Sequence, residues 1–264
     1  MDRALLPALA FAFAAAAVAF PAGAILIRAD RDDEEYRELA TRYPAAVGLG
    51  AAGGSGALIA PRWVLTTAQR AAALREAKAA LRVDGATHEI QEFFVHPGWK
   101  PGGEPDVALL FLRSPVAGRE PAPIYRMSDE AGQAARIVGR GATGRIGGKP
   151  AGSDGRPRAA INTVDRVGPL TLGVRLKGPE DASDLQGALA PDDAGAPAFF
   201  EAGGRIFVAG IASRTEDTNG DGIAGSVGDW ETYSRVSAFA GWIDDVMSKA
   251  AVAEAARETA APRR

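Results

Sequence analysis

Short apolar runs separated by glycine- and proline-rich turns are the feature that most constrains what this chain can fold into. The 264 residues include 32 glycines and 17 prolines, and no long helical period interrupts the runs. Runs of strand length lie at residues 46–49, 56–59, 63–66, 88–95, 107–112, 136–138, 170–176, 198–200, 206–211 and 233–236. Many short strands with close turns are typical of an all-β barrel protein, which is the fold class we expect.

Two segments have helical spacing instead. Tyr36, Leu39 and Tyr43 predict a short amphipathic helix in the charged N-terminal segment, residues 25–44. An apolar face recurs at helical spacing from Ala238 to about Glu258 and predicts a helix at the end of the β-rich region.

Charge and cysteine content exclude several classes of function. Lys and Arg number 30 against 33 Asp and Glu, so the formal net charge is -3 and binding of nucleic acid by phosphate neutralisation is not expected. The chain has no cysteine, which excludes disulfides, thiolate catalysis and cysteine-ligated metals. A glycine-rich loop with basic residues, 139–157, has the composition of a phosphate cradle but lacks the strand–loop–helix context of one.

The N-terminus predicts export. An uncharged run extends from Ala4 to Ile27 and contains Pro21-Ala22-Gly23-Ala24, a small-residue pattern that suits signal peptidase. We therefore expect residues 1–24 to be a signal peptide and the mature protein to be secreted or periplasmic. The run is long enough to span a bilayer if it stays uncleaved, and the alternative is a membrane-anchored envelope structural protein.

Three motifs occur in a fixed order. Residues 54–69 read GSGALIAPRWVLTTAQ, residues 106–112 read DVALLFL, and residues 192–197 read DDAGAP. With the tetrapeptide YSRV at 233–236 and the terminal helix, they resemble the chymotrypsin/trypsin-like serine peptidase family.

The resemblance covers residues 45–248 and implies a fold. It implies two antiparallel six-stranded β-barrels, roughly residues 45–130 and 131–237, with a cleft between them and a C-terminal helix. Residues 249–264 then form an Ala/Arg-rich tail.

The same resemblance implies that the catalytic residues are changed. Gln69 stands at the position of the family's histidine and Ala194 at that of its serine, while Asp106 keeps the acid. A methyl group cannot attack a carbonyl, and an amide cannot take up a proton near neutral pH. We therefore expect an inactive homologue that binds a protein or peptide partner in the inter-barrel cleft. The alternative is an active serine endopeptidase with a non-standard site.

Neighbouring positions also depart from the family. Asp192 stands at the oxyanion position, where a negative charge opposes a developing oxyanion. Ala188 at the floor of the specificity pocket offers no charge to Lys or Arg. Ser213 matches a serine that bonds the family's acid. His88 and His96 are the only histidines, and we expect neither to reach the cleft.

Asp193 matches an aspartate that pairs, in the family, with the α-amino group created by cleavage. Cleavage before Ile25 can supply such a group, but more than 20 residues separate Ile25 from the first strand, which argues against its insertion. Arg70 or another basic side chain is the competing partner.

One loop predicts calcium. Residues 217–222 read DTNGDG and place oxygen donors at alternate positions. The expected ligands are Asp217, Asn219, Asp221, the Ile223 carbonyl and Asp229. The alternative is an Asx-rich hairpin turn, because the twelfth position is Gly228 and not glutamate. No other cofactor is expected.

Overall fold

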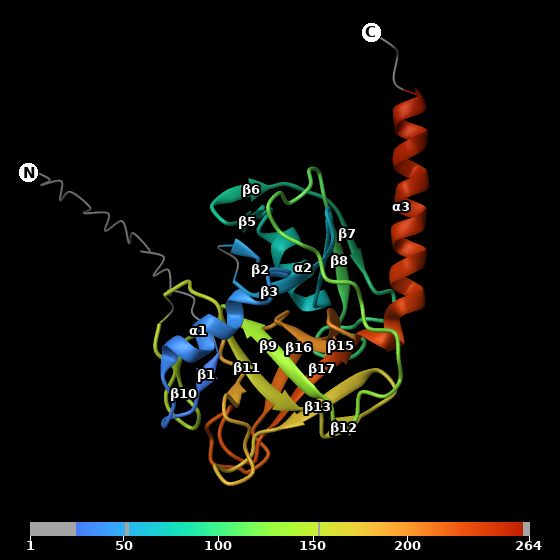
Figure 1. Ribbon diagram of the computed structural model, residues 1–264. Coiled ribbons are helices and arrows are strands. Elements are labelled where there is room, and N and C mark those ends of the chain that lie inside the picture. The colour runs from blue at the N-terminus through green and yellow to red at the C-terminus, as the bar shows by residue number, and fades with distance from the viewer. Residues whose placement is uncertain (1–24, 51–52, 153, 261–264) are drawn as a thin grey trace, which may run out of the picture.

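Two curled antiparallel sheets make up most of the protein, and Figure 1 shows one above the other. The computed structural model describes residues 25–50, 53–152 and 154–260, so the predicted signal peptide and the end of the predicted tail lie outside the described residues. The β-rich class and the C-terminal helix are confirmed. The strands divide five and seven between the main sheets instead of six and six.

The first sheet has the strand order β2-β3-β4-β8-β7, and a small hairpin, β5-β6, lies beside it. Its strands are β2 (Ala46–Gly48), β3 (Ser55–Ala60), β4 (Trp63–Thr66), β7 (Ile90–Val95) and β8 (Ala108–Leu112), with β5 (Leu81–Val83) and β6 (Ala86–His88) in the hairpin.

The second sheet has the order β11-β9-β15-β16-β17-β13-β12. Its strands are β9 (Ala134–Gly139), β11 (Arg158–Thr163), β12 (Arg166–Val167), β13 (Thr171–Arg175), β15 (Pro197–Ala202), β16 (Arg205–Glu216) and β17 (Trp230–Arg235). A third, three-stranded sheet has the order β10-β1-β14 and consists of β1 (Leu26–Ile27), β10 (Gly144–Arg145) and β14 (Gly187–Ala188).

The main core joins the two large sheets. Leu65 and Leu109 of the first sheet belong to the same buried cluster as Phe199 and Val208 of the second. Removing this apolar surface from water favours the face-to-face arrangement of the sheets. The two sheets are therefore held together by one shared core.

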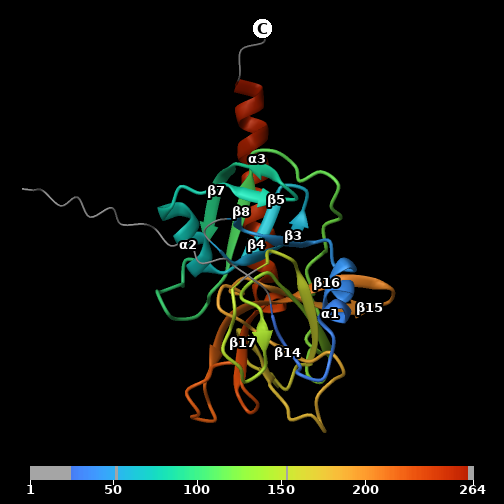
Figure 2. The same ribbon diagram turned by 90° about the vertical axis from the view of Figure 1, so that its left-hand side faces the viewer.

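The C-terminal helix packs on this core and then projects. A 3-10 turn, η2 (Val236–Phe239), leads into α3 (Ala240–Ala260), whose Ile243 and Ala250 are buried. Both views show α3 rising past the first sheet (Figures 1 and 2). The helix therefore continues through most of the segment predicted as a tail. Within the described residues, no helix is long and apolar enough to cross a membrane.

One helix was not predicted. α2 (Ala68–Glu76) follows β4 directly, and the Thr67 side chain caps it by accepting the Arg70 N–H at 3.3 Å. The helix lacks a wide apolar stripe, so its sequence carries little periodic signal. It matters for the site because Gln69 and Arg70 lie in its first turn.

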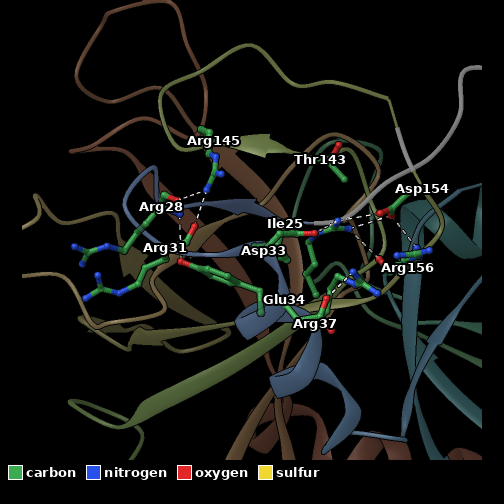
Figure 3. A network of polar contacts seen from close by, with 12 residues as sticks. Ile25, Arg28, Arg31, Asp33, Glu34, Arg37, Thr143, Arg145, Asp154 and Arg156 are labelled. Carbon is green, nitrogen blue, oxygen red and sulfur yellow. Dashed lines mark hydrogen bonds and ion pairs between the residues drawn. The ribbon is translucent and has the colours of Figure 1, made fainter.

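The N-terminal segment belongs to the second sheet's half of the molecule and is not a free linker. β1 lies between β10 and β14, and α1 (Asp33–Thr41) forms where a helix was expected. Arg145 donates to the carbonyls of Arg28 and Arg31, as Figure 3 shows. Arg158 of β11 forms ion pairs with Asp33 and with a second aspartate. The segment is thus held by strand pairing and by side-chain contacts.

Candidate functional site

Gln69, Asp106 and Ser213 form a hydrogen-bonded polar cluster between the two sheets, in which Asp106 is buried and Gln69 is exposed. Gln69 Nε2 donates to Asp106 Oδ2 at 2.9 Å and to the Ser213 carbonyl at 3.0 Å. Ser213 Oγ donates to the same Asp106 oxygen at 2.7 Å, and the Gln69 N–H donates to Asp106 Oδ1 at 3.0 Å. Both oxygens of the buried Asp106 are therefore satisfied without an imidazole. The expected contact between Ser213 and Asp106 is present.

Ala194 lies beside this cluster, in the wall of a pocket that Ser213 also lines. The Ala194 carbonyl accepts the Ser55 N–H of β3 at 3.1 Å, which ties the loop to the first sheet. The side chain is a methyl group, so this position carries no nucleophile.

The pocket has a volume of about 640 Å³ and a mostly apolar lining. Leu189, Ala190 and Pro191 form one side, and Ile223 and Ala224 form another. Ala188, predicted at the pocket floor, is fully buried and packs with Leu26 just behind the wall. Of the described residues, Asp192 is the one Asp or Glu that lines the pocket.

Asp192 forms an ion pair with Arg70. Arg70 Nη2 and Asp192 Oδ1 are 3.1 Å apart, and the arginine side chain is mostly buried, with 19% of its surface exposed. Asp192 has a φ of 71°, in the left-handed region that favours glycine. The backbone of Asp192 thus adopts a conformation that suits glycine, and its side chain points toward Arg70 in α2. Arg70, expected as a rival partner of Asp193, binds the neighbouring aspartate instead.

Asp193 is completely buried, and its carboxylate accepts a hydrogen bond from the backbone of Ile25. The Ile25 N–H donates to Asp193 Oδ2 at 3.0 Å, and the Gly141 and Ala190 N–H groups donate at 2.6 and 2.9 Å. The argument that residues 25–45 are too long for this insertion was wrong, because α1 takes up the length against β11. Burial raises the pKa of Asp193 to about 7. Among the described residues, no Lys, Arg or His forms an ion pair with it.

Glu231 is a buried acid that the sequence reasoning missed. It lies on β17, accepts the Leu189 N–H behind the pocket wall and accepts the Tyr233 hydroxyl at 2.6 Å. Burial raises its pKa to about 7. The sequence held one signal for it. Residues two apart in a strand lie on the same face of the sheet, so a buried Tyr233 implies that Glu231 is buried as well.

The two histidines have other surroundings. His88 ends β6 and is buried in the first sheet's hairpin. His96 packs against Phe239 and Trp242 at the base of the C-terminal helix, where burial lowers its pKa. Neither shares a hydrogen bond with Asp106, whose partners are given above.

The 217–229 loop is held by its own hydrogen bonds. Asp217 accepts the N–H groups of Gly220 and Gly222 at 2.8 and 2.9 Å. Asp229 accepts four backbone N–H groups from the same loop. Among the described residues, no three His, Cys, Asp or Glu side chains gather closely enough to hold a metal ion. Calcium at this loop stays a prediction.

Comparison with known proteins agrees with this architecture. Among curated proteins, no relative matches the chain. The family model described as Trypsin matches residues 33–243, a span that runs from the start of α1 to the first turn of α3 and includes the Gln69–Asp106–Ser213 cluster, the apolar pocket and the buried Asp193. A match of this length covers well over half of the chain, and the protein therefore belongs to the trypsin family.

Proposed function

We propose that this trypsin-family protein is a catalytically inactive homologue that binds a peptide or protein segment in the cleft between its sheets. The contacts of Gln69 carry the proposal. Its amide nitrogen donates one hydrogen bond to Asp106 and one to the Ser213 carbonyl, which uses both of its hydrogens. The only other polar atom of that side chain is a carbonyl oxygen, which cannot accept a proton near neutral pH. With Ala194 as the neighbouring wall residue, base and nucleophile are both lacking.

The pocket favours a binding role and indicates the kind of side chain it holds. Its lining by Leu189, Pro191 and Ile223 suits an apolar side chain. Arg70 neutralises the carboxylate of Asp192, so none of the described residues that line the pocket selects Lys or Arg. We therefore expect the partner segment to insert an apolar residue here.

We further propose that the protein is exported and that its mature chain begins at Ile25. The buried hydrogen bond from the Ile25 N–H to Asp193 supports this start. An α-ammonium group at that position supplies the positive charge that the buried carboxylate lacks among the described residues, whereas an amide supplies only a neutral N–H.

Two assays test the function. The purified mature protein is incubated with a serine-directed phosphonate and with a mixed library of peptide substrates, and we expect neither covalent labelling nor cleavage. Labelling that disappears on mutation of one serine would overturn the proposal.

Binding is measured separately, by selecting displayed ten-residue peptides on the mature protein. Ala224→Trp fills the pocket from its exposed rim and should abolish binding of the selected peptides. Ala251→Trp, on the exposed part of α3, is the matched control and should bind them normally. Equal binding by both variants would place the peptides elsewhere.

A further inference from the structure

Arg140 is a partly buried cation that forms no ion pair with any residue the structure describes. It follows β9 and lies against β2 of the other sheet, so close that a Cβ on Gly48 would meet Arg140 Cδ at 3.0 Å. The buried Nε–H has no acceptor among the described residues. Within the described ranges, its guanidinium makes one hydrogen bond, from Nη1 to the Gly155 carbonyl at 3.3 Å. Buried donors that lack a hydrogen-bond acceptor are uncommon in folded proteins.

The surrounding charges leave this cation uncompensated. The carboxylate that acts on it electrostatically, Asp84, binds two nitrogens of Arg119. Arg119 also acts on Arg140 by like-charge repulsion, and burial together with that repulsion lowers the pKa of Arg140. Arg119 and Arg140 thus share one carboxylate, Asp84, and the three side chains together carry a net positive charge.

The position of Arg140 connects it to the cleft. The next residue, Gly141, donates to Asp193 and so holds the loop that carries Ala194. On the side of the first sheet, the segment after Gly48 leads to Gly53, whose Cβ position lies 3.1 Å from Asp192 Oδ1. Arg140 therefore lies at the junction of the two sheets, beside the loop that forms the pocket wall.

We propose that Arg140 binds an acidic side chain of the peptide or protein segment held in the cleft. The inference rests on the proposed function and adds the chemistry of the partner, namely an apolar residue for the pocket and an Asp or Glu for Arg140. The outer part of the guanidinium, which carries the Nη groups, stays partly exposed, and a planar guanidinium without a counter-ion suits a carboxylate. Charge complementarity of this kind fixes the register of a bound segment and selects among partners.

An anion titration tests the Arg140 site without any peptide. Sulfate replaces chloride at constant ionic strength, and the unfolding midpoint is followed for the wild type, Arg140→Gln and Arg140→Lys. Sulfate stabilises folded proteins in general, so the site is read from the difference between variants. The midpoint should rise most for the wild type, less for Arg140→Lys and least for Arg140→Gln. Arg205→Gln, at an exposed arginine of β16 outside any ion pair among the described residues, removes the same charge and should respond as the wild type does. Equal responses of Arg140→Gln and the wild type overturn the site.

Peptide selection tests the partner's chemistry. Selected peptides should carry Asp or Glu, and changing that residue to Gln or Asn should weaken binding to the wild type roughly tenfold, about 1.4 kcal/mol. Arg140→Gln should bind the acidic peptide and its neutral analogue equally. If the acidic residue matters equally to the wild type and to Arg140→Gln, the inference is wrong even though the cleft binds peptides. If no peptide binds while sulfate still separates the two proteins, the proposed function fails and the anion site stands.

Discussion

Cleavage before Ile25 should change how stability depends on pH, because it changes the atom that faces Asp193. In a chain extended before Ile25, that atom is an amide nitrogen 3.0 Å from Asp193 Oδ2. The folded-state pKa of Asp193 is then about 7, against 3.8 for the ordinary carboxyl group. A raised folded-state pKa stabilises the fold fully below about pH 3.8, and this contribution is lost as the pH rises through about 7. The loss corresponds to about 4 kcal/mol.

In the chain that begins at Ile25, the same nitrogen is an ammonium group. It favours the ionised carboxylate and lowers the pKa of Asp193 relative to the extended chain. A buried pair of this kind costs about 3–5 kcal/mol when one partner is removed. The extended chain should therefore lose about 4 kcal/mol more stability than the processed chain between pH 4 and pH 8.

Urea unfolding followed by tryptophan fluorescence measures the difference. One protein begins at Ile25 and the other at Ala22, and both are compared from pH 4 to pH 9. Glu231 is present in both proteins and raises the pKa of Asp193 by like-charge repulsion, so the Asp193 variants are needed to assign the difference. Asp193→Asn in both backgrounds should remove the difference. Parallel pH profiles of the two unmodified chains would refute the pairing of Ile25 with Asp193.

Four further outcomes are expected. Intact-mass measurement of protein exported by a bacterial host should give a chain beginning at Ile25, whereas a full-length mass with membrane association supports the anchored alternative. Ala194→Ser alone should show no turnover of a peptide ester, and Ala194→Ser with Gln69→His should recover at most weak turnover, limited by Asp192; full activity of the single variant would contradict the role given to Gln69. Gln69→Ala should lower the free energy of unfolding by about 1–3 kcal/mol, because the mostly buried Asp106 loses a donor, and an unchanged urea midpoint would show that water replaces the amide. Millimolar calcium should raise the unfolding midpoint relative to excess chelator, because the free energy of unfolding rises by about 2.7 kcal/mol at a hundredfold excess over the dissociation constant. Asp221→Ala should abolish that response, and identical midpoints in the unchanged chain would leave the 217–229 loop as a turn.

The strands were predictable because their signal is local. The runs at 63–66 and 107–112 correspond closely to β4 and β8, both fully buried and strongly apolar. β11 was missed because Arg158 and Asn162 interrupt its pattern, although both are buried through specific partners. Local pattern cannot register such partners, because they lie far away in the sequence.

The candidate site was predictable where a motif fixed it and unpredictable where tertiary packing decided it. The motifs placed Gln69, Asp106 and Ser213 in one cluster, and the hydrogen bonds join them. The motifs did not predict α2, whose capped first turn places Arg70 within ion-pair distance of Asp192. Nor did they indicate how α1 brings Ile25 to Asp193, because sequence separation alone does not reveal the path of the chain.

The three-stranded sheet β10-β1-β14 has a consequence for the order of folding. β1 comes from the start of the described chain, while its partners β10 and β14 come from the middle and from the far half. The first-made strand therefore stays without neighbours until most of the polypeptide has been synthesised, and such non-local closure is slow. Docking of β1 should be a late kinetic step. Because β14 leads directly into Leu189 and Ala190, the pocket wall acquires its final form only at that step.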